Sequence, residues 1–382
     1  MLLRMKQTSG IISTYSADVF GVCSALFELG GMTVMHDASG CNSTYTTHDE
    51  PRWMDMDAMV YISGLSEMEA IMGDDAKLID DIVQAAEELH PRFITVAGTP
   101  IPAMTGFDYE ACAAVIESRT GIPAMGISTT GMNSYIHGAS MAYLAFCKKF
   151  LRRDVEKSEK PSVNILGMTP LDFSVKGEAQ SVEQFCRNAG FAVNANFSMG
   201  CTFEELVNAG AAHVNLVVSA AGLETARWME ETFGIPYVIG TPAAGDYMSS
   251  LSGALRYAVE NRTSRLCHRH CGKAGDIAVI GENIRSIALA EAITDSTERA
   301  CRVVSSVSDT ILRDGDIYAP WEDDVIEAIR DAKVVIADPL FHPIVPASAT
   351  FIPNPHEACS GRIWREDIIN PADSIETILR QL

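Results

Sequence analysis

Short apolar runs rich in valine and isoleucine recur along the chain and alternate with segments of helical periodicity. The clearest runs cover residues 92–98, 162–167, 213–218, 276–281 and 333–338, and each is about as long as one fully buried strand. Helices are indicated between them, for example over residues 77–89 and from Thr202, a predicted N-cap. Buried strands that alternate with helices are typical of parallel sheets covered on their faces by helices. The sequence therefore predicts an α/β protein.

A weak internal repeat indicates that successive parts of the chain share one plan. Residues 115–123 and 228–236 each read as a helix end, a glycine and the start of a new strand. A charged segment at 148–160 and an irregular segment at 262–275 interrupt the pattern. We therefore expect three Rossmann-like units with parallel sheets flanked by helices. They cover residues 1–155, 160–265 and 270–382, the last being shorter and ending in a helix over 371–382.

The charge of the chain bears on its partners. With 29 Lys and Arg against 50 Asp and Glu, the formal charge is −21, which disfavours nucleic acid and anionic membranes. There is no run of about 18 or more apolar residues, and the N-terminal residues lack the apolar core of a signal peptide, so we expect a cytoplasmic protein. In that reducing compartment the 10 cysteines are expected to be thiols or metal ligands.

Two cysteines in the first unit have the surroundings of cluster ligands. Cys23 precedes a predicted helix, and Cys41 follows a short predicted strand and Gly40. A thiolate at a helix N-terminus is stabilised by the helix dipole and unpaired N–H groups, and a glycine lets the backbone approach a bulky inorganic cluster. The spacing alone fits two unrelated buried cysteines equally well, because it is not a specific metal signature.

The segment around these cysteines resembles the cluster region of nitrogenase component 1. There a first Cys lies before a helix and a His-Gly-Pro-x-Gly-Cys turn supplies the second, and the turn here reads His36-Asp-Ala-Ser-Gly-Cys41. The resemblance continues through residues 61–78, 91–100, 121–129 and 214–237, and it is strongest over 11–145 and 162–240. It implies an iron–sulfur cluster held by Cys23 and Cys41, with Gly40 at the turn.

Departures from the family pattern narrow the expected cofactor. Where the family usually has a third cluster cysteine before a proline, this chain has Thr99-Pro100, which leaves two thiolates per subunit. The resemblance then implies a [4Fe-4S] cluster shared by two chains, in a homodimer or in a heterodimer with a related component 1-like chain. The apolar residues around Leu26 and Phe27 are expected to help bury the contact between the two chains.

The family's smaller relatives suggest the reaction. Ser219 lies near the position where nitrogenase α subunits use a cysteine for the iron–molybdenum cofactor, so dinitrogen is not the expected substrate. The chain is similar in its length, and in its small number of cluster cysteines, to the reductive cyclase that makes the nickel tetrapyrrole of methanogens. That resemblance implies a catalytic subunit that reduces an organic or tetrapyrrole substrate. Its electrons would come from a separate ATP-hydrolysing iron protein, in keeping with the absence of a Gly-x-x-x-x-Gly-Lys-Ser/Thr loop from this sequence.

Candidate site residues come from the ends of predicted strands. His36 and Asp37 are the catalytic candidates, with His36 as a proton donor or, alternatively, as a structural hydrogen-bonding group of the turn. Thr99, Pro100 and Ser219 are candidates to line the substrate site. A second acid–base set, His48, Asp49 and Glu50, is explained equally well as a polar turn before Pro51.

Other cysteines and histidines stay ambiguous. Cys267, His268, His270 and Cys271 include ordinary zinc ligands, but four ligands within five residues would strain a tetrahedral site. Cys359 either faces a substrate or lies in a turn. Two further functions remain open for the whole chain: a scaffold on which a metal cofactor is assembled, and a cluster-free module that binds a small molecule.

Overall fold

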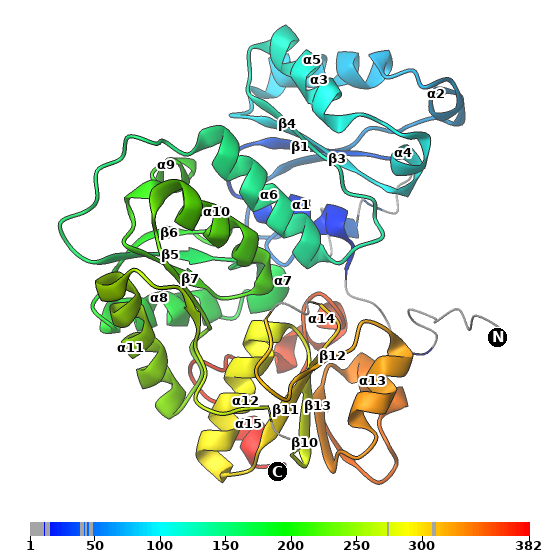
Figure 1. Cartoon of the computed structure of the whole chain (residues 1–382). Coiled ribbons are helices and arrows are strands. Elements are labelled where there is room, and N and C mark those ends of the chain that lie inside the picture. Colours follow the sequence, from blue (N-terminus) through cyan, green and yellow to red (C-terminus); the bar gives the residue numbers. More distant parts are fainter. Residues whose placement is uncertain are drawn as a thin grey trace, which may run out of the picture.

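The computed structural model describes residues 11, 16–38, 42, 44–45, 49–272, 275–307 and 311–382. It contains three parallel sheets flanked by helices, which confirms the predicted α/β class (Figure 1). The first sheet has the order β2-β1-β3-β4, the second β6-β5-β7-β8-β9 and the third β12-β11-β10-β13-β14. Five strands, β3, β5, β7, β10 and β13, lie where the apolar runs predict them.

The first sheet consists of β1 (Met32–His36), β2 (Met59–Ile62), β3 (Ile94–Gly98) and β4 (Ala124–Ile127). Its helices are α1 (Asp18–Leu26), α2 (Glu67–Met72), α3 (Ala76–Leu89), α4 (Pro100–Thr105), α5 (Tyr109–Thr120) and α6 (Tyr135–Phe150). The second sheet consists of β5 (Ser162–Leu166), β6 (Ala192–Asn196), β7 (Val214–Val217), β8 (Tyr237–Ile239) and β9 (Arg265–Leu266). Its helices are α7 (Pro170–Phe173), α8 (Glu178–Asn188), α9 (Phe203–Val207), α10 (Leu223–Phe233) and α11 (Asp246–Asn261).

The third sheet consists of β10 (Ile277–Ile280), β11 (Cys301–Ser305), β12 (Ile317–Tyr318), β13 (Val334–Ala337) and β14 (Thr350–Pro353). Its helices are α12 (Asn283–Thr297), α13 (Glu322–Ile329), α14 (Gly361–Trp364) and α15 (Glu376–Leu379). The predicted helix over 371–382 was wrong, since only α15 forms there. The side chain of Asn370 donates hydrogen bonds to Asp373 and Ser181. These bonds hold the residues before α15 in a turn.

The internal repeat marks two equivalent helix ends. Gly121 ends α5 and Gly234 ends α10, with φ angles of 69° and 65° respectively. Each glycine amide donates a hydrogen bond to the carbonyl of the residue four positions earlier. Glycine adopts this left-handed conformation without the steric cost that a side chain would add. The chain therefore leaves both helices in the same direction and enters β4 and β8.

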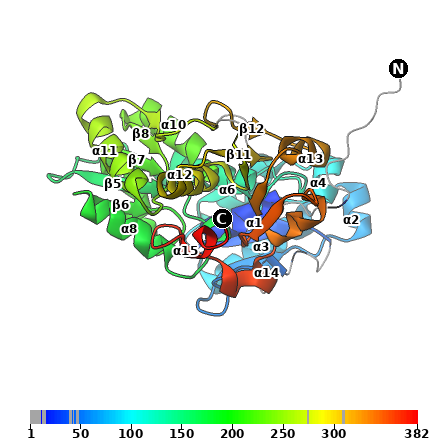
Figure 2. The same cartoon turned by 90° about the horizontal axis from the view of Figure 1, so that it is seen from below.

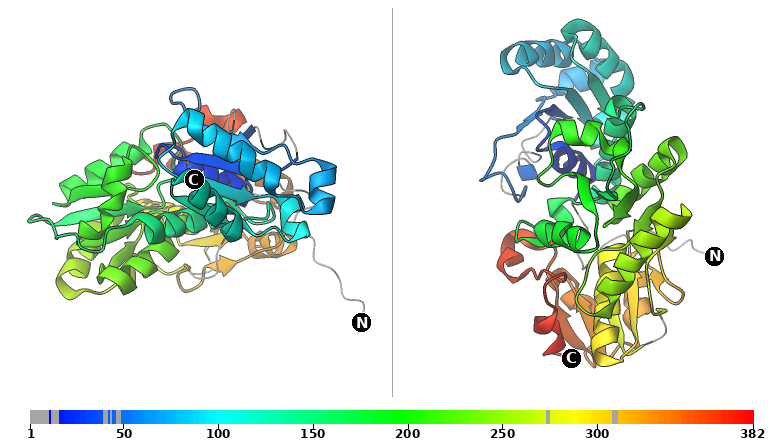
Figure 3. Two further views of the ribbon diagram at one scale, coloured as in Figure 1. Left: turned by 90° about the horizontal axis from the view of Figure 1, so that it is seen from above. Right: turned by 90° about the vertical axis from the view of Figure 1, so that its left-hand side faces the viewer.

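The three units share one continuous hydrophobic core. It contains residues of α1 and α6 together with residues of the second and third sheets. Two smaller cores lie on the outer faces, one between the first sheet and helices α3 and α5, the other between the third sheet and α13. The first and third units lie at opposite ends of the molecule, with the second unit beside both (Figure 1 and Figure 3, right). Seen from below, the first and third units overlap and the second unit lies to one side (Figure 2). We retain the predicted unit boundaries as a proposal: the first falls between two sheets, and the second, at residue 265, lies within β9, the last strand of the second sheet.

Helices α1 and α6 cross very closely at the centre of the molecule. A Cβ atom on Gly21 would collide with the carbonyl of Tyr135, and one on Gly138 would collide with the carbonyl of Asp18. The two glycines therefore permit backbone-to-backbone packing that no other residue allows. Among the residues that the structure describes, no helix is both long and apolar enough to cross a membrane.

Candidate functional site

The carboxyl end of the first sheet brings together four of the predicted residues. His36 ends β1, and its Nδ1 lies 2.9 Å from the hydroxyl of Ser63, which follows β2. The backbone N–H of Asp37 donates to the same hydroxyl over 3.1 Å. Thr99, which follows β3 and precedes Pro100, donates its hydroxyl to the carbonyl of His36 over 2.7 Å. The loops that follow three neighbouring strands are thus hydrogen-bonded to one another.

The environment of His36 favours its structural role over proton donation. Burial lowers the pKa of the imidazole to about 4, an effect that the charge of Asp37 only partly opposes. The ring also packs against Phe107, with 4.5 Å between the ring centroids. A ring of this kind is neutral near pH 7 and holds no proton to donate from a charged form. The hydrogen bond to Ser63 accounts for the position of the imidazole.

We predict that His36 makes the fold acid-sensitive. Its folded-state pKa lies below the ordinary value of about 6.5, so the unfolded chain binds the proton first and stability is lost as pH falls from about 6.5 through about 4. His36→Gln should remove about 2–3 kcal/mol of that loss. Urea unfolding between pH 7 and pH 4 measures it, with the exposed His268→Gln as the control. Parallel pH profiles for the wild type and His36→Gln would contradict the prediction.

The predicted position of Cys23 before a helix was wrong. Helix α1 already begins at Asp18, so Cys23 lies inside it, where the helix N-terminus is too far away to stabilise a thiolate. The side chain is buried, and burial, followed by the charge of Glu50, raises the pKa of the thiol. The helix starts early because the Asp18 carboxylate accepts backbone hydrogen bonds from Thr130 and Gly131.

Tyr45, a described residue that follows the second thiol in the sequence, packs on the same face of α1 as Cys23. The ring of Tyr45 stacks on Phe20, one helical turn before Cys23, with 5.0 Å between centroids. Cys41, Gly40 and His48 lie outside the described residues. A thiol is a soft metal ligand, and metal binding replaces its proton. Cys23 carries the donor type that an iron–sulfur cluster needs, and this residue is 1% exposed within the hydrophobic core.

Two sequence-based expectations about this region need correction. Leu26 and Phe27 are buried within the chain, 2% and 6% exposed, so they belong to its own core and not to a contact between two chains. Glu50 is no part of an open acid–base set, since it is fully buried and its Oε1 accepts a 2.7 Å hydrogen bond from Arg52. The polar-turn alternative for residues 48–50 describes Glu50 better.

A second cluster of polar side chains, missed by the sequence reasoning, lies between the second and third units. Asp172 follows β5, Glu282 follows β10, Asp338 follows β13 and His356 follows β14. With Arg285 they line a cavity of about 40 Å³, enough for a few water molecules. Glu282 directly follows the apolar run at 276–281, and Asp338 is the last residue of the run at 333–338. Attention to the residues at the ends of these two runs would have found both Glu282 and Asp338.

Contacts at this central cavity shift the pKa values of two carboxyl groups in opposite directions. His356 Nε2 lies 3.3 Å from Asp172 Oδ1, and the Tyr135 hydroxyl donates to the same oxygen. Although burial alone raises it, these partners hold the pKa of Asp172 below its ordinary value. Burial and the Asp172 charge raise the pKa of Glu282 to about 7. Two carboxyl groups whose pKa values are shifted in opposite directions are the usual basis of acid and base roles at one site.

Ser219 and Cys359 lie next to this cavity. The hydroxyl of Ser219 donates to the carbonyl of Gly167 over 2.9 Å, and the next amide, that of Ala220, donates to Glu282 over 2.9 Å. Burial, with the charges of Asp338 and Asp172, raises the pKa of the Cys359 thiol. The structure thus places Ser219 beside the second set of polar groups, whereas Thr99 and Pro100 belong to the first.

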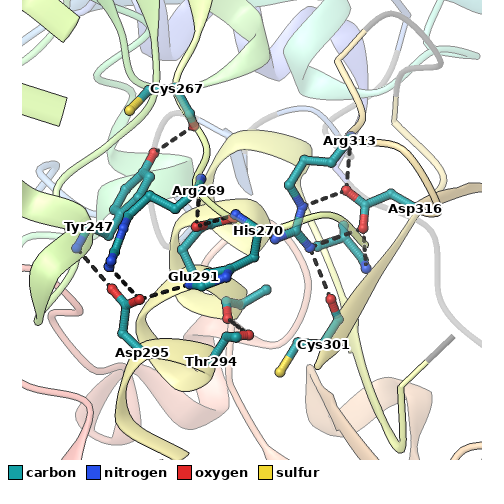
Figure 4. A network of polar contacts seen from close by, with 12 residues as sticks. Tyr247, Cys267, Arg269, His270, Glu291, Thr294, Asp295, Cys301, Arg313 and Asp316 are labelled. Carbon is teal, nitrogen blue, oxygen red and sulfur yellow. Dashed lines mark hydrogen bonds and ion pairs between the residues drawn. The ribbon is translucent and has the colours of Figure 1, made fainter. Parts of the chain in front are cut away.

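The segment 267–271 is held in a polar network (Figure 4). The backbone N–H groups of Arg269 and His270 donate to Glu291, and both side chains reach Asp295. The carbonyl of Cys267 accepts a hydrogen bond from the Tyr247 hydroxyl. In the part of the chain that the structure describes, no group of three or more Cys, His, Asp or Glu side chains is arranged to hold a metal ion.

Comparison with known proteins gives one consistent family. The model of nitrogenase component 1 type oxidoreductases matches residues 19–287. The nitrogenase iron-molybdenum cofactor biosynthesis protein NifE of Clostridium pasteurianum is 30% identical over 182 residues, which cover 47% of this chain and 38% of that protein. One of the subunits of the light-independent protochlorophyllide reductase of Leptolyngbya boryana is 28% identical over 179 residues, covering 44% of this chain and 35% of the relative.

A third relative and a solved structure extend the comparison. The nitrogenase molybdenum-iron protein alpha chain of Clostridium pasteurianum is 29% identical over 182 residues, 47% of this chain and 33% of the relative. The chain thus aligns with only about a third of the length of these curated relatives. A solved structure, nitrogenase Cp1 at pH 6.5, shares the fold with a TM-score of 0.72 and 14% identity over 100% of this chain and 94% of that chain.

Proposed function

Since this chain belongs to the nitrogenase component 1 type oxidoreductases, we propose that it is the catalytic subunit of a two-component reductase. Its substrate would be an organic molecule or a tetrapyrrole, and its electrons would come from a separate ATP-dependent iron protein. The observation that carries this proposal is the central cavity, where Glu282 and the Asp172–His356 pair meet at the carboxyl ends of strands from two sheets. One of its relatives is itself named as part of a protochlorophyllide reductase.

Cys23 and Cys41 would hold a [4Fe-4S] cluster, shared with a second copy of the chain or with a related chain. Such a cluster supplies electrons one at a time when it is bound. The hydrogen bonds among His36, Asp37 and Ser63 would keep the turn before Cys41 in place. We retain His36 and Asp37 as candidate site residues in this positioning role.

The groups around the central cavity would manage protons. Reduction of one double bond consumes two electrons and two protons, so a reductase needs acids beside its substrate as well as an electron source. With a pKa of about 7, Glu282 would take up or release a proton near neutral pH, while Asp172 stays ionised and orients His356. Ser219, and from the first unit Thr99 and Pro100, would line the path to the substrate. At about 40 Å³ the cavity is smaller than ordinary ligand pockets, so substrate binding requires its walls to move.

Exposed apolar side chains at the carboxyl end of the first sheet suit a partner protein. Helix α2 buries none of its residues, and five large apolar side chains of α2, α4 and the loop after β4 are between 67% and 87% exposed. We call this surface the methionine patch; it consists of Met68, Ile71, Met72, Met104 and Met132. Patches of this kind mark interaction sites, and methionine adapts well to a partner surface. We propose that the electron-donating protein binds here.

Electron transfer from a nitrogenase-type iron protein of the same organism tests the proposal. After anaerobic mixing with MgATP, oxidation of the reduced iron protein should be rapid with the wild-type chain and absent without ATP. Met72→Glu should slow it at least tenfold, because it places a charge within an apolar contact. Ile363→Glu, equally exposed but on α14, is the control and should have no effect. Equal oxidation without ATP would contradict the two-component mechanism.

A scaffold for metal-cofactor assembly is the second candidate, and the similarity to NifE favours it. A scaffold would release its metal cargo to another protein, whereas a reductase keeps its cluster through many turnovers. Incubation of the iron-loaded chain with an acceptor apoprotein, followed by separation and iron analysis, distinguishes the two.

A further inference from the structure

Strand β4 forms an open edge of the first sheet. It pairs with β3 on one side, and no described strand pairs with it on the other. In this parallel pair the amide of Ile94 donates to the carbonyl of Pro123 over 2.9 Å, so the alternation of the ladder turns the backbone of Gly126 away from β3. The Ala124 amide follows the same alternation, since it donates outward to Glu117 over 3.0 Å. The N–H and carbonyl groups of Gly126 therefore lie on the open side of the sheet.

A groove of about 470 Å³ runs along this edge, and its volume is within the range of ordinary ligand sites. All four residues of β4, together with Ser128, line one side. The other side is a single face of α6, because its residues are spaced three or four positions apart. This face consists of Met141, Leu144, Ala145 and Lys148.

The groove has a cationic end. The carboxylate of Glu117 accepts hydrogen bonds from the Lys149 side chain and from the amide of Ala124, so the last turn of α6 lies beside the first residue of β4. Lys148 is exposed at this end and makes no ion pair within the described residues. Glu110 of α5 is the acidic side chain of the lining. An apolar helix face thus leads along the groove to a free ammonium group.

We propose that an extended segment of a partner protein adds to β4 as a fifth strand and lies in this groove. This inference does not depend on the proposed function. An open strand edge is a template for pairing, and a peptide backbone supplies the acceptor and donor that the outward groups of Gly126 require. A small apolar ligand would leave these groups unpaired.

The spacing along α6 specifies the side chains of the partner segment. Leu144 and Lys148 are one helical turn apart, about 6 Å, which matches about two residues of an extended strand. Side chains two positions apart in a strand face the same way. The segment should therefore carry an apolar residue that packs on Leu144 and, two positions away, an acidic residue that pairs with Lys148.

Fluorescence anisotropy with a labelled peptide tests the proposal. The peptide alternates valine and threonine, with one valine replaced by glutamate, and it should bind the wild-type chain with a Kd below about 1 mM. Leu144→Asp should weaken binding about tenfold, because it places a charge on the apolar wall. Lys148→Glu should weaken it about threefold, the range of one exposed ion pair. A peptide with lysine in place of the glutamate should reverse that preference and bind Lys148→Glu more tightly than the wild type.

Lys333→Glu is the matched control, since Lys333 is 72% exposed in the third unit and the variant makes the same change of charge. It should bind the peptide as the wild type does, and thermal unfolding of each variant checks that the fold is kept. The proposal is overturned if the peptide shows no saturable binding or binds Leu144→Asp with unchanged affinity. It is also overturned if sedimentation shows a wild-type dimer that Leu144→Asp dissociates, because the occupant of the groove is then a second copy of the chain.

Discussion

Replacing Arg313 with methionine should lower the free energy of unfolding by about 3–5 kcal/mol. The Arg313 side chain is fully buried and binds Glu291 over 2.7 Å, Asp316 over 3.0 Å and the carbonyl of Cys301 over 3.1 Å (Figure 4). Both carboxylates are fully buried as well, so the substitution leaves two buried charges without their cation. Because Glu291 also binds the segment 267–271, the loss should loosen the third unit from the second.

Urea unfolding followed by circular dichroism measures this effect. Arg330→Met is the control, because Arg330 and its partner Glu327 are 75% and 66% exposed and such surface pairs contribute little. We expect a change within about 0.5 kcal/mol for that variant. A loss below about 1 kcal/mol for Arg313→Met would show that the buried network does not depend on its cation.

Cys23→Ala should abolish iron binding after anaerobic reconstitution, with a loss of more than tenfold in bound iron and in visible absorption. The thiol is one of the two donors of the proposed cluster, whereas the helix around it is held by apolar packing and by Gly21 and Gly138. Cys41→Ala should have the same effect. Cys186→Ala, a buried cysteine of α8, should bind iron normally. Visible absorption that survives in both Cys23→Ala and Cys41→Ala would remove these two residues as ligands.

Much of the fold could be predicted because its signals are local. An apolar run of five or six residues predicts a buried strand wherever it occurs, and a glycine after a helix predicts the turn at Gly121 or Gly234. The capping box of Thr202 and Glu205 is equally local, and the structure confirms Thr202 as the N-cap of α9. The order of these signals was enough to identify three parallel sheets.

The failures have nonlocal causes. The start of α1 depends on contacts of Asp18 with residues more than a hundred positions away, so the sequence around Cys23 could not reveal it. Leu26 and Phe27 seemed available for a dimer contact only because the chain that covers them was unknown. The central cavity combines residues that follow β5, β10, β13 and β14, and the carboxylate of Glu50 becomes exceptional only once its burial is known.

Helix α6 links the central cavity with helix α1, which carries Cys23, as a single rigid body. Its first residue, Tyr135, binds Asp172 at the central cavity, and one turn later Gly138 receives the backbone of α1, which carries Cys23. The separation between the thiol and the cavity is therefore set by helical backbone and not by flexible side chains. In the proposed reductase, electron tunnelling from a cluster at Cys23 to the cavity would slow steeply with distance. This crossing would then keep the tunnelling distance constant even when the cavity walls move to admit a substrate. A larger residue at Gly138 would push α1 and α6 apart. It would lengthen the tunnelling path although every donor side chain would still be present.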